Sequence, residues 1–490
     1  MPRNLLKMRY LLVAMLPLLP GAPALAGAWA EAGDAQLRSD VSLLTNAGVL
    51  TTLGTQWPLP WRGVAAALDN PALASQPRFI QEAARRVRAR ALHETEQDTL
   101  HVDAVVDATN RPALIRGFDA QGQGKAQAQA VLEYNAGGTT THIAAGAITD
   151  STRAGGTKID LDGSYIAHQF GGAMVYGGYV NHWWGPGWVS ALSASTNARP
   201  IPQIGIATSS PQRFGTPLLS WIGPWRAEFF VGILDDPRLA GNTAYNGFRF
   251  TFAPVKGLEI GLTRTQMLCG SGHDCNPLKA YFDIRNNDKN VNDSNDQGNI
   301  DVRYSNSIGG YPVEIYAQFM NEDTNPFSHS FTSHLVGASV WVPVGANTAR
   351  LTTEYTSSIA TRDIFSFNNV GYGVSYNNSR YPDGMRYRDR TLGFSLDSDS
   401  RLLTLQANVT DAHDRSYTLS LHRARVSTLQ TGAANIVSPA PVTINYMEAR
   451  VVVPAKFADF SLGGRLQDDR PRPDRGFGGA VEAAVTFHLR

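Results

Sequence analysis

The sequence predicts an all-β transmembrane barrel of about 18 antiparallel strands, preceded by a small N-terminal helical region on the periplasmic side. Three observations lead to this fold class. The chain begins with an export signal, most of it alternates apolar and polar residues with a period of two, and no later stretch is apolar enough for a membrane-spanning helix. We therefore expect a signal peptide over residues 1–26, a periplasmic helical region over 27–95 and an outer-membrane barrel over 96–490.

The first 26 residues have the layout of a secretory signal peptide. Arg3, Lys7 and Arg9 precede the apolar run 11–19, and small residues at 24–26 provide a cleavage site. The apolar run is too short, and too interrupted by proline, to cross a bilayer as a helix. An exported chain of this kind is periplasmic, secreted or a membrane barrel, and the rest of the sequence has to distinguish these.

The next segment has helical periodicity. Apolar residues recur at near-helical intervals between Leu37 and Val49, and Gly48 stands where a glycine would end the helix. A second helix is expected around 64–68, and a third over 79–90, where helix-forming residues dominate and basic residues gather toward the C-terminal turn. The prediction is a compact helical region of some sixty residues.

From about residue 99 the period changes to two. In the segments 313–319, 403–409, 417–421, 447–453 and 481–489 the odd-numbered residues are apolar and most of the even-numbered residues are polar. Strands of about ten residues with one apolar and one polar face are typical of membrane barrels, with lipid outside and the lumen inside. At about 20 residues per strand and connection, the barrel would hold about 18 strands.

A soluble β-sandwich would alternate as well. Its solvent-facing residues would be rich in lysine, but lysine is scarce in the C-terminal half, where the polar faces mix acids with arginines. Pairs such as Asp301 with Arg303, or Glu448 with Arg450, suit a filled lumen in which opposite charges meet. We therefore favour the membrane barrel, which would contact outer-membrane lipids.

Charge and cysteine content narrow the possible partners. The formal net charge of +1 provides no field that would draw the chain to nucleic acid. The two cysteines, Cys269 and Cys275, enclose only five residues, and in an oxidising compartment we expect them to form a disulfide. A metal site that combines them with His273 and Asp274 is the less favoured alternative, because no second cysteine or histidine pair lies nearby.

Motifs for catalysis or cofactor binding are missing from the sequence. It has no nucleophile elbow, phosphate loop, dinucleotide fingerprint or helical zinc pair, so we name no catalytic residue and expect no cofactor. The segment 286–298 resembles a calcium loop, but Tyr304 stands where the closing glutamate should be. We therefore predict no metal site there, and interpret the segment as an extracellular loop.

The most distinctive motif is the segment 181–189, Asn-His-Trp-Trp-Gly-Pro-Gly-Trp-Val, followed by Asn-Ala-Arg-Pro-Ile-Pro at 197–202. Both are rigid turns that cannot lie within a helix or a central strand. They resemble the signature of the capsule assembly Wzi family, and the resemblance extends to the segments 53–58, 161–165, 223–225, 258–264 and 282–285. It implies an 18-stranded outer-membrane lectin that helps to hold capsular polysaccharide at the bacterial surface, with export machinery as a further partner.

Indole rings can stack on the C–H faces of sugars, and an arginine can bind an acidic sugar's carboxylate through two hydrogen bonds. Trp183, Trp184, Trp188 and Arg199 are therefore candidates for polysaccharide binding. The alternative, which we favour for the tryptophans, is that they are architectural and hold a turn or an interfacial girdle. Further candidates lie on expected loops: Tyr372, Tyr376, Tyr381, Arg386 and Tyr387.

Three functions are compatible with these features. The first is a non-enzymatic outer-membrane protein that binds capsular or extracellular polysaccharide and supports its assembly and attachment. The second is a diffusion channel for small solutes or oligosaccharides, which would need an open lumen. The third is a secreted carbohydrate-active enzyme. The signal peptide, the alternation and the resemblance together favour the first.

Overall fold

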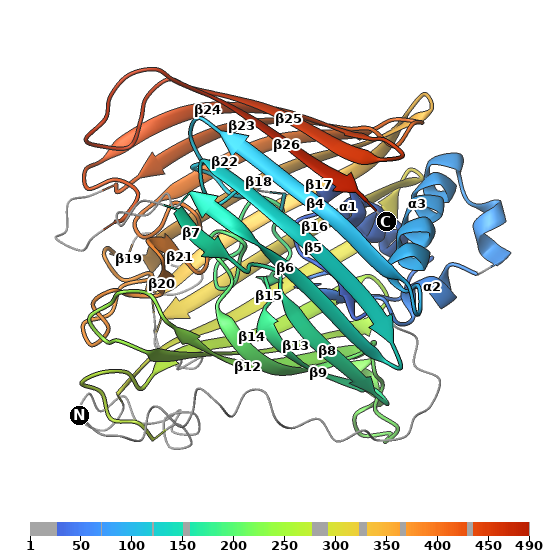
Figure 1. Cartoon of the computed structure of the whole chain (residues 1–490), viewed down its shortest axis with the longest axis horizontal. Coiled ribbons are helices and arrows are strands. Elements are labelled where there is room, and N and C mark those ends of the chain that lie inside the picture. The colour runs from blue at the N-terminus through green and yellow to red at the C-terminus, as the bar shows by residue number, and fades with distance from the viewer. Residues whose placement is uncertain are drawn as a thin grey trace.

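The strands of the protein close into a barrel in which each wall strand pairs antiparallel with the next one along the chain (Figure 1). The computed structural model describes residues 27–69, 71–119, 122–149, 157–276, 293–322, 331–362, 369–428 and 435–489. The predicted signal peptide and most of the calcium-like segment lie outside the described residues. The ring closes where β26 pairs with β4, with Val485 opposite Val106.

The barrel has the 18 strands expected from the sequence. β7 and β8 pair with different parts of β6 and count together as one strand of the wall. The two-residue β19 (Val370–Gly371) pairs with the end of β18 and is not counted. The wall strands are β4 (Leu100–Thr109), β5 (Ala126–Ala136), β6 (Thr139–Thr149), β7 (Thr157–Asp160), β8 (Tyr165–Phe170), β9 (Ala173–Tyr179), β11 (Pro202–Thr208), β12 (Trp225–Leu234), β13 (Thr243–Val255), β14 (Leu258–Leu268), β15 (Ser294–Ile308), β16 (Tyr311–Glu322), β17 (Thr332–Val344), β18 (Asn347–Thr361), β22 (Arg401–Thr410), β23 (Ser416–Val426), β24 (Val442–Pro454), β25 (Ala458–Gln467) and β26 (Gly478–His488).

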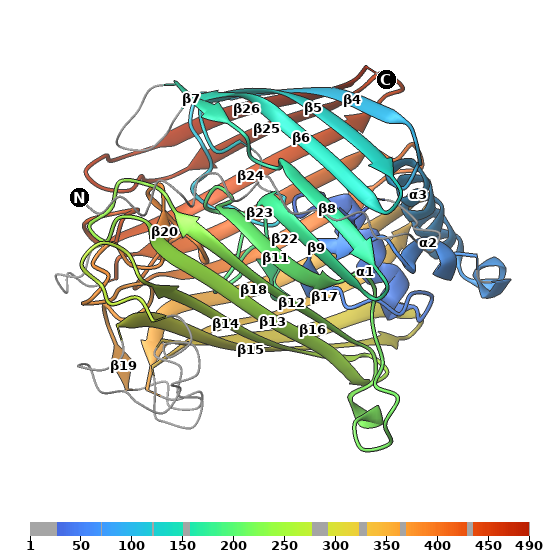
Figure 2. The ribbon, with the colours of Figure 1, turned by 60° about the horizontal axis from the view of Figure 1, so that its bottom comes forward.

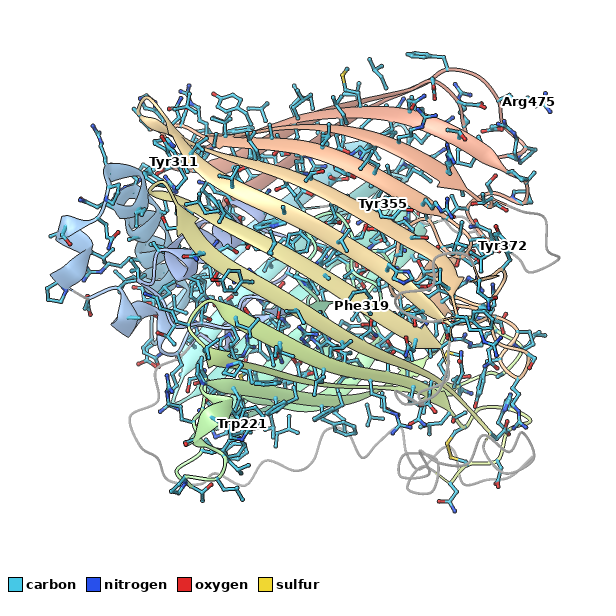
Figure 3. The ribbon with its side chains drawn as sticks, turned by 180° about the vertical axis from the view of Figure 1, so that it is seen from behind. Trp221, Tyr311, Phe319, Tyr355, Tyr372 and Arg475 are labelled. Carbon is cyan, nitrogen blue, oxygen red and sulfur yellow. A yellow bond between two sulfur atoms is a disulfide. The ribbon has the colours of Figure 1, made fainter. Side chains whose placement is uncertain are left out.

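The two faces of the wall follow the predicted alternation. In β22, Leu405 points outward and is 54% exposed, whereas Asn408 points inward and is 2% exposed. Figure 3 shows apolar and aromatic side chains, among them Phe319 and Tyr355, on the strands of this outer surface. The predicted register is therefore confirmed. The exterior is the apolar surface that a lipid bilayer requires.

The two ends of the barrel differ in the length of their connections. At one end, tight turns such as 137–138, 309–310 and 345–346 join most of the strands, with the connection 209–224, which contains the 3₁₀ turn η3 (Ser220–Ile222), as a longer exception. Long loops such as 235–242 and 369–400 project from the other end (Figure 1). Outer-membrane barrels have short periplasmic turns and long extracellular loops. The helices and the C-terminus lie at the short-turn end, which we identify as periplasmic (Figure 2).

The N-terminal helices are close to those predicted. α1 (Ala35–Asn46) begins where the Asp34 side chain accepts the backbone N–H of Leu37, and ends just before Gly48, whose φ is +74°. α2 (Val64–Ala67), the 3₁₀ turn η2 (Pro71–Ser75) and α3 (Arg78–Glu94) follow. No helix in the described part of the chain has the length and apolarity needed to cross a membrane.

Part of the N-terminal region enters the barrel, which the predicted division at residue 95 did not anticipate. β1 (Trp29–Ala30) pairs with β3 (Leu59–Pro60), and β2 (Gln56–Trp57) pairs with β10 (Trp183–Trp184). These short strands lie inside the wall, so residues 49–61 and 180–201 together fill the lumen. We call these two segments the plug.

Candidate functional site

The three tryptophans of the distinctive motif lie in the plug. Trp183 and Trp184 are fully buried, and Trp188 is 3% exposed. The Trp183 indole N–H donates to the carbonyl of Gly187 at 2.9 Å, which closes the turn on itself. The Trp188 indole N–H donates to Glu314 of β16 at 2.8 Å. The burial of these rings is what an architectural role requires, and their sugar binding stays a prediction.

Polar side chains of the wall hold the plug in place. Glu354 of β18 accepts the backbone N–H of Trp188 at 2.7 Å. Gln318 of β16 donates to the carbonyl of Trp184 and accepts the backbone N–H of Leu192. In the first plug segment, 49–61, the carbonyls of Leu53, Gln56 and Pro58 accept hydrogen bonds from Arg226 of β12. The lumen is therefore filled by hydrogen-bonded chain, as the mixed charges in the sequence indicated.

Arg199 is already engaged within the protein. Its Nε and Nη2 donate to both carboxylate oxygens of Asp162, at 2.7 and 2.9 Å, and Nη2 also reaches Asp160 at 3.1 Å. Asp160 and Asp162 come from β7 and the bend before β8. Arg199 therefore makes the predicted bidentate contact with a carboxylate, but the carboxylate is that of Asp162 in the protein itself.

The predicted loop residues gather in residues 369–400 at the extracellular end, which we call the cap. In the cap, β20 (Arg386–Tyr387) pairs with β21 (Arg390–Thr391). Tyr376, Tyr381 and Tyr387 are each at most 1% exposed, and Tyr372 is half-buried. The Tyr376 hydroxyl donates to the carbonyl of Leu192 at 2.7 Å, which links the cap to the plug. Burial raises the pKa of the Tyr376 hydroxyl, so this donor keeps its proton.

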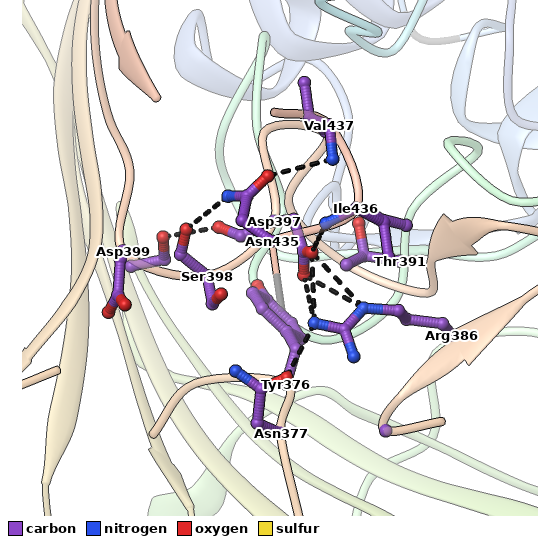
Figure 4. A network of polar contacts seen from close by, with 12 residues as sticks. Tyr376, Asn377, Arg386, Thr391, Asp397, Ser398, Asp399, Asn435, Ile436 and Val437 are labelled. Carbon is purple, nitrogen blue, oxygen red and sulfur yellow. Dashed lines mark hydrogen bonds and ion pairs between the residues drawn. The ribbon is translucent and has the colours of Figure 1, made fainter. Parts of the chain in front are cut away.

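A buried network around Arg386 stiffens the cap (Figure 4). Arg386 Nη2 donates to Asp397 at 2.9 Å and to Asn377 at 2.8 Å. Asp397 also accepts the backbone N–H of Ile436 at 2.7 Å, and Asn435 donates to the carbonyl of Ser398 at 2.6 Å. The loop before β22 and the loop before β24 are therefore joined by charge-assisted hydrogen bonds. This network backs one wall of a pocket.

The pocket lies at the extracellular mouth and has a volume of about 470 Å³. We call it the arginine pocket, because arginines outnumber acids among the residues that line it. Its charged lining residues are Arg111, Arg388, Arg390, Arg465, Arg472, Asp389 and Asp474. They come from four separate parts of the chain: the β4–β5 loop, the cap, the end of β25 and the β25–β26 loop.

The arginines of the pocket differ in how well their charge is matched. Arg465 pairs with Glu482, Arg472 with Asp469 at 2.9 Å and Arg388 with Asp235 at 3.4 Å. Loss of hydration in the pocket is what lowers the pKa of the Arg390 guanidinium, to about 10. Burial, reinforced by the nearby charge of Arg390, lowers the pKa of Arg116 to about 9. Positive charge is therefore in excess here, and an anion would be stabilised.

Sequence reasoning named neither this pocket nor its arginines. The only local signal was the density of arginine in 386–390 and 470–475, which looks the same as in any solvated loop. Cys269 and Cys275, in contrast, form the expected disulfide, with Cα atoms 4.5 Å apart. Beside it, the Tyr381 hydroxyl donates to the carbonyl of Cys269, which ties the cap to this loop.

A closed barrel with an apolar exterior, a filled lumen and an extracellular cap defines the class: an outer-membrane β-barrel protein. The family model described as capsule assembly protein Wzi matches residues 95–469. The chain therefore belongs to the capsule assembly Wzi family, which confirms the resemblance seen in the sequence.

Two relatives can be compared with it. The solved structure of Wzi from Escherichia coli, described as an outer-membrane protein involved in group 1 capsule assembly and a carbohydrate-binding β-barrel, superposes with a TM-score of 0.79 at 19% identity, and covers 94% of this chain and 100% of that one. A Klebsiella pneumoniae protein, described as an uncharacterized 55.8 kDa protein in the cps region, is 24% identical over 296 residues. That match spans 58% of this chain and 57% of the relative.

Proposed function

We propose that this protein is a non-enzymatic binding protein of the outer membrane, which holds an acidic capsular or extracellular polysaccharide at the cell surface through its arginine pocket. The observation that carries the proposal is the excess of arginine over acid in a pocket at the extracellular mouth. Guanidinium groups bind carboxylates through paired, charge-assisted hydrogen bonds. Uronic acids and pyruvylated sugars carry such carboxylates.

Two further observations support this function over a diffusion channel. The chain belongs to a capsule assembly family, and the solved Escherichia coli relative is described as carbohydrate-binding. The plug occupies the lumen and is hydrogen-bonded to the wall at β18 and at β12. A polymer bound at the mouth would be retained there, with assembly or export proteins as further partners.

Retention of polymer by living cells tests the proposal. A deletion strain should make the same total amount of polymer but release more of it into the medium, because anchoring acts after synthesis. Complementation with the unaltered gene should restore cell-bound polymer. Unchanged retention in the deletion strain would refute the proposal.

Binding by the purified protein locates the site. Arg390→Ala and Arg111→Ala should each weaken binding to immobilised polygalacturonate by roughly 10- to 100-fold, the loss expected for a charged hydrogen bond. Arg475→Ala is the matched control, because Arg475 is exposed on the same end of the barrel but does not line the pocket (Figure 3). Uncharged dextran should bind weakly to all of them. Equal losses for Arg390 and Arg475 would place the binding elsewhere.

A further inference from the structure

At the opposite end of the barrel, three side chains with metal-binding atoms meet where the helical region joins the wall. His93 lies in the last turn of α3, Glu96 in the connection that follows it, and His101 near the start of β4. One ligand atom from each lies within 4.8 Å of the other two. The two imidazole rings are edge to face, with centroids 4.4 Å apart. The juxtaposition brings together two histidines and a carboxylate from three successive pieces of backbone.

His101 supplies an independent observation. Its side chain is only 11% exposed, and its Nε2 is buried without a hydrogen-bond partner among the described residues. The nearest carboxylate oxygen, Glu96 Oε2, lies 3.5 Å away. A buried imidazole nitrogen whose one contact is too long for an ordinary hydrogen bond carries a cost that a ligand would remove. It points to an occupant between the three side chains.

The surroundings favour a cation as that occupant. His93 and His101 line a cavity of about 270 Å³ at the periplasmic mouth, together with five acidic residues, one arginine and two further histidines, His142 and His488. The arginine, Arg90, is already paired with Glu94. The acidic lining residues are Glu31, Asp34, Glu94, Asp103 and Glu133. His142 pairs with Glu133 and His488 with Asp103, but the five acids still outnumber these two histidines and Arg90. The formal charge of the lining is therefore negative, opposite in sign to that of the arginine pocket.

The ligand set identifies the class of cation. Imidazole nitrogens select transition metals over calcium or magnesium, and two histidines with one carboxylate are a known set for zinc. Metal–ligand bonds of about 2.0–2.2 Å place tetrahedral ligand atoms roughly 3.3–3.6 Å apart, so the three ligand atoms, which lie within 4.8 Å of one another, would draw closer around the ion. We propose that His93, Glu96 and His101 bind a zinc-type divalent ion that tethers α3 to β4, with water as the fourth ligand.

This tether would matter for the position of the helical region. α3 packs against α1, and α1 reaches the wall, where the Trp341 indole N–H donates to Ser39 at 3.0 Å. A metal that binds only the folded arrangement stabilises it by mass action. The helical region would then be fixed at the periplasmic mouth both by packing through α1 and by coordination through α3.

The experiment uses the full-length protein in detergent micelles, without a polyhistidine tag and stripped of metal. Titration with zinc against a chromophoric chelator should give one tight site per chain. His93→Ala and His101→Ala should each weaken zinc binding by at least the roughly 100-fold that loss of a single supporting partner can cost. His413→Ala is the control, because His413 is exposed in the β22–β23 turn at the same end. It should bind zinc like the unaltered protein.

Glu96→Gln provides a variant that is expected to fold, because the Glu96 side chain is 51% exposed. It should keep heat-modifiable migration on a gel and still weaken zinc binding. X-ray absorption at the zinc edge should show two imidazole nitrogens in the unaltered protein. The proposal is overturned if no zinc binds, or if zinc binds the His93→Ala, His101→Ala double variant as well as it binds the control.

Discussion

Arginines lie both in the wall around the plug and in the arginine pocket, but their charge is matched in one region and partly unmatched in the other. In the wall around the plug, Arg249 donates to both oxygens of Asp301, at 2.8 and 3.0 Å, and both side chains are fully buried. At the mouth, three of the five lining arginines pair with acids outside the pocket, whereas no ion pair reaches Arg111 or Arg390 from the described residues. A buried charge without a partner is costly, so matched charges hold structure together, whereas an unmatched excess is stabilised when a ligand arrives. The matched arginines therefore support the barrel, and the unmatched arginines would bind an acidic polysaccharide.

The largest effect should come from breaking a plug contact that combines bulk with a hydrogen bond. Trp188→Ala removes a large buried ring and leaves Glu314 without its indole donor, which should cost about 3–5 kcal/mol of stability. The folded, heat-modifiable fraction in membranes should fall, and polymer retained per folded molecule should stay constant. If retention per folded molecule falls while the folded fraction is normal, Trp188 touches sugar instead.

Removing one member of a matched ion pair should be almost as damaging. Arg249→Ala leaves Asp301 buried and uncompensated, and also removes a donor to the carbonyl of Thr55 in the plug. We expect a loss of about 3–5 kcal/mol, measured as a lower midpoint of heat-modifiable unfolding, and an increase in bilayer conductance as the plug loosens. The double replacement Arg249→Met with Asp301→Leu is the control and should lie close to the unaltered protein. If the double replacement destabilises the barrel as much as Arg249→Ala does, the uncompensated charge of Asp301 is not the cause.

A charge on the lipid-facing side of the wall should reduce stability by a smaller amount. Leu405→Arg places a charge in the lipid-facing side of β22 and should cost about 2–4 kcal/mol near the bilayer midplane. Gln406→Arg faces the lumen, where it loses the hydrogen bond that Arg350 donates, and should cost less than Leu405→Arg. Folding yield into lipid vesicles measures both. The reverse order would mean that this strand is shifted by one residue, because such a shift exchanges the two faces.

Added salt should have the smallest effect. It should weaken polymer binding at the arginine pocket but leave the stability of the barrel and plug almost unchanged. Exposed charges more than about 8 Å apart are largely screened at physiological ionic strength, while buried pairs are screened much less. Binding of polygalacturonate should therefore weaken several-fold as salt rises from low to physiological concentration. The unfolding midpoint should change little over the same range. Salt-insensitive binding would indicate that sugar stacking, and not charge, dominates at the mouth.

Much of the barrel was predictable because its signal is local. Successive side chains of a strand point to opposite faces, so the alternation around Leu405 and Gln406 already specified which residue meets lipid. Gly48 marked the end of the first helix for an equally local reason, since a cap acts on adjacent backbone groups. The disulfide followed from two cysteines that are close in sequence, in a chain with an export signal.

The plug and both candidate sites depended on the tertiary structure. The pairing of Trp183 with Trp57 joins residues that no periodicity relates, and it decided that a motif rich in aromatic residues is buried instead of exposed. Arg199, a sugar-binding candidate from sequence, meets Asp162 only because the chain folds back on the wall. The sequence by itself determined the barrel, its faces and its family, since these follow from neighbouring residues and a contiguous motif. Only the closed fold decided where charge is matched and where it is left over, because that balance depends on which distant loops converge on one pocket.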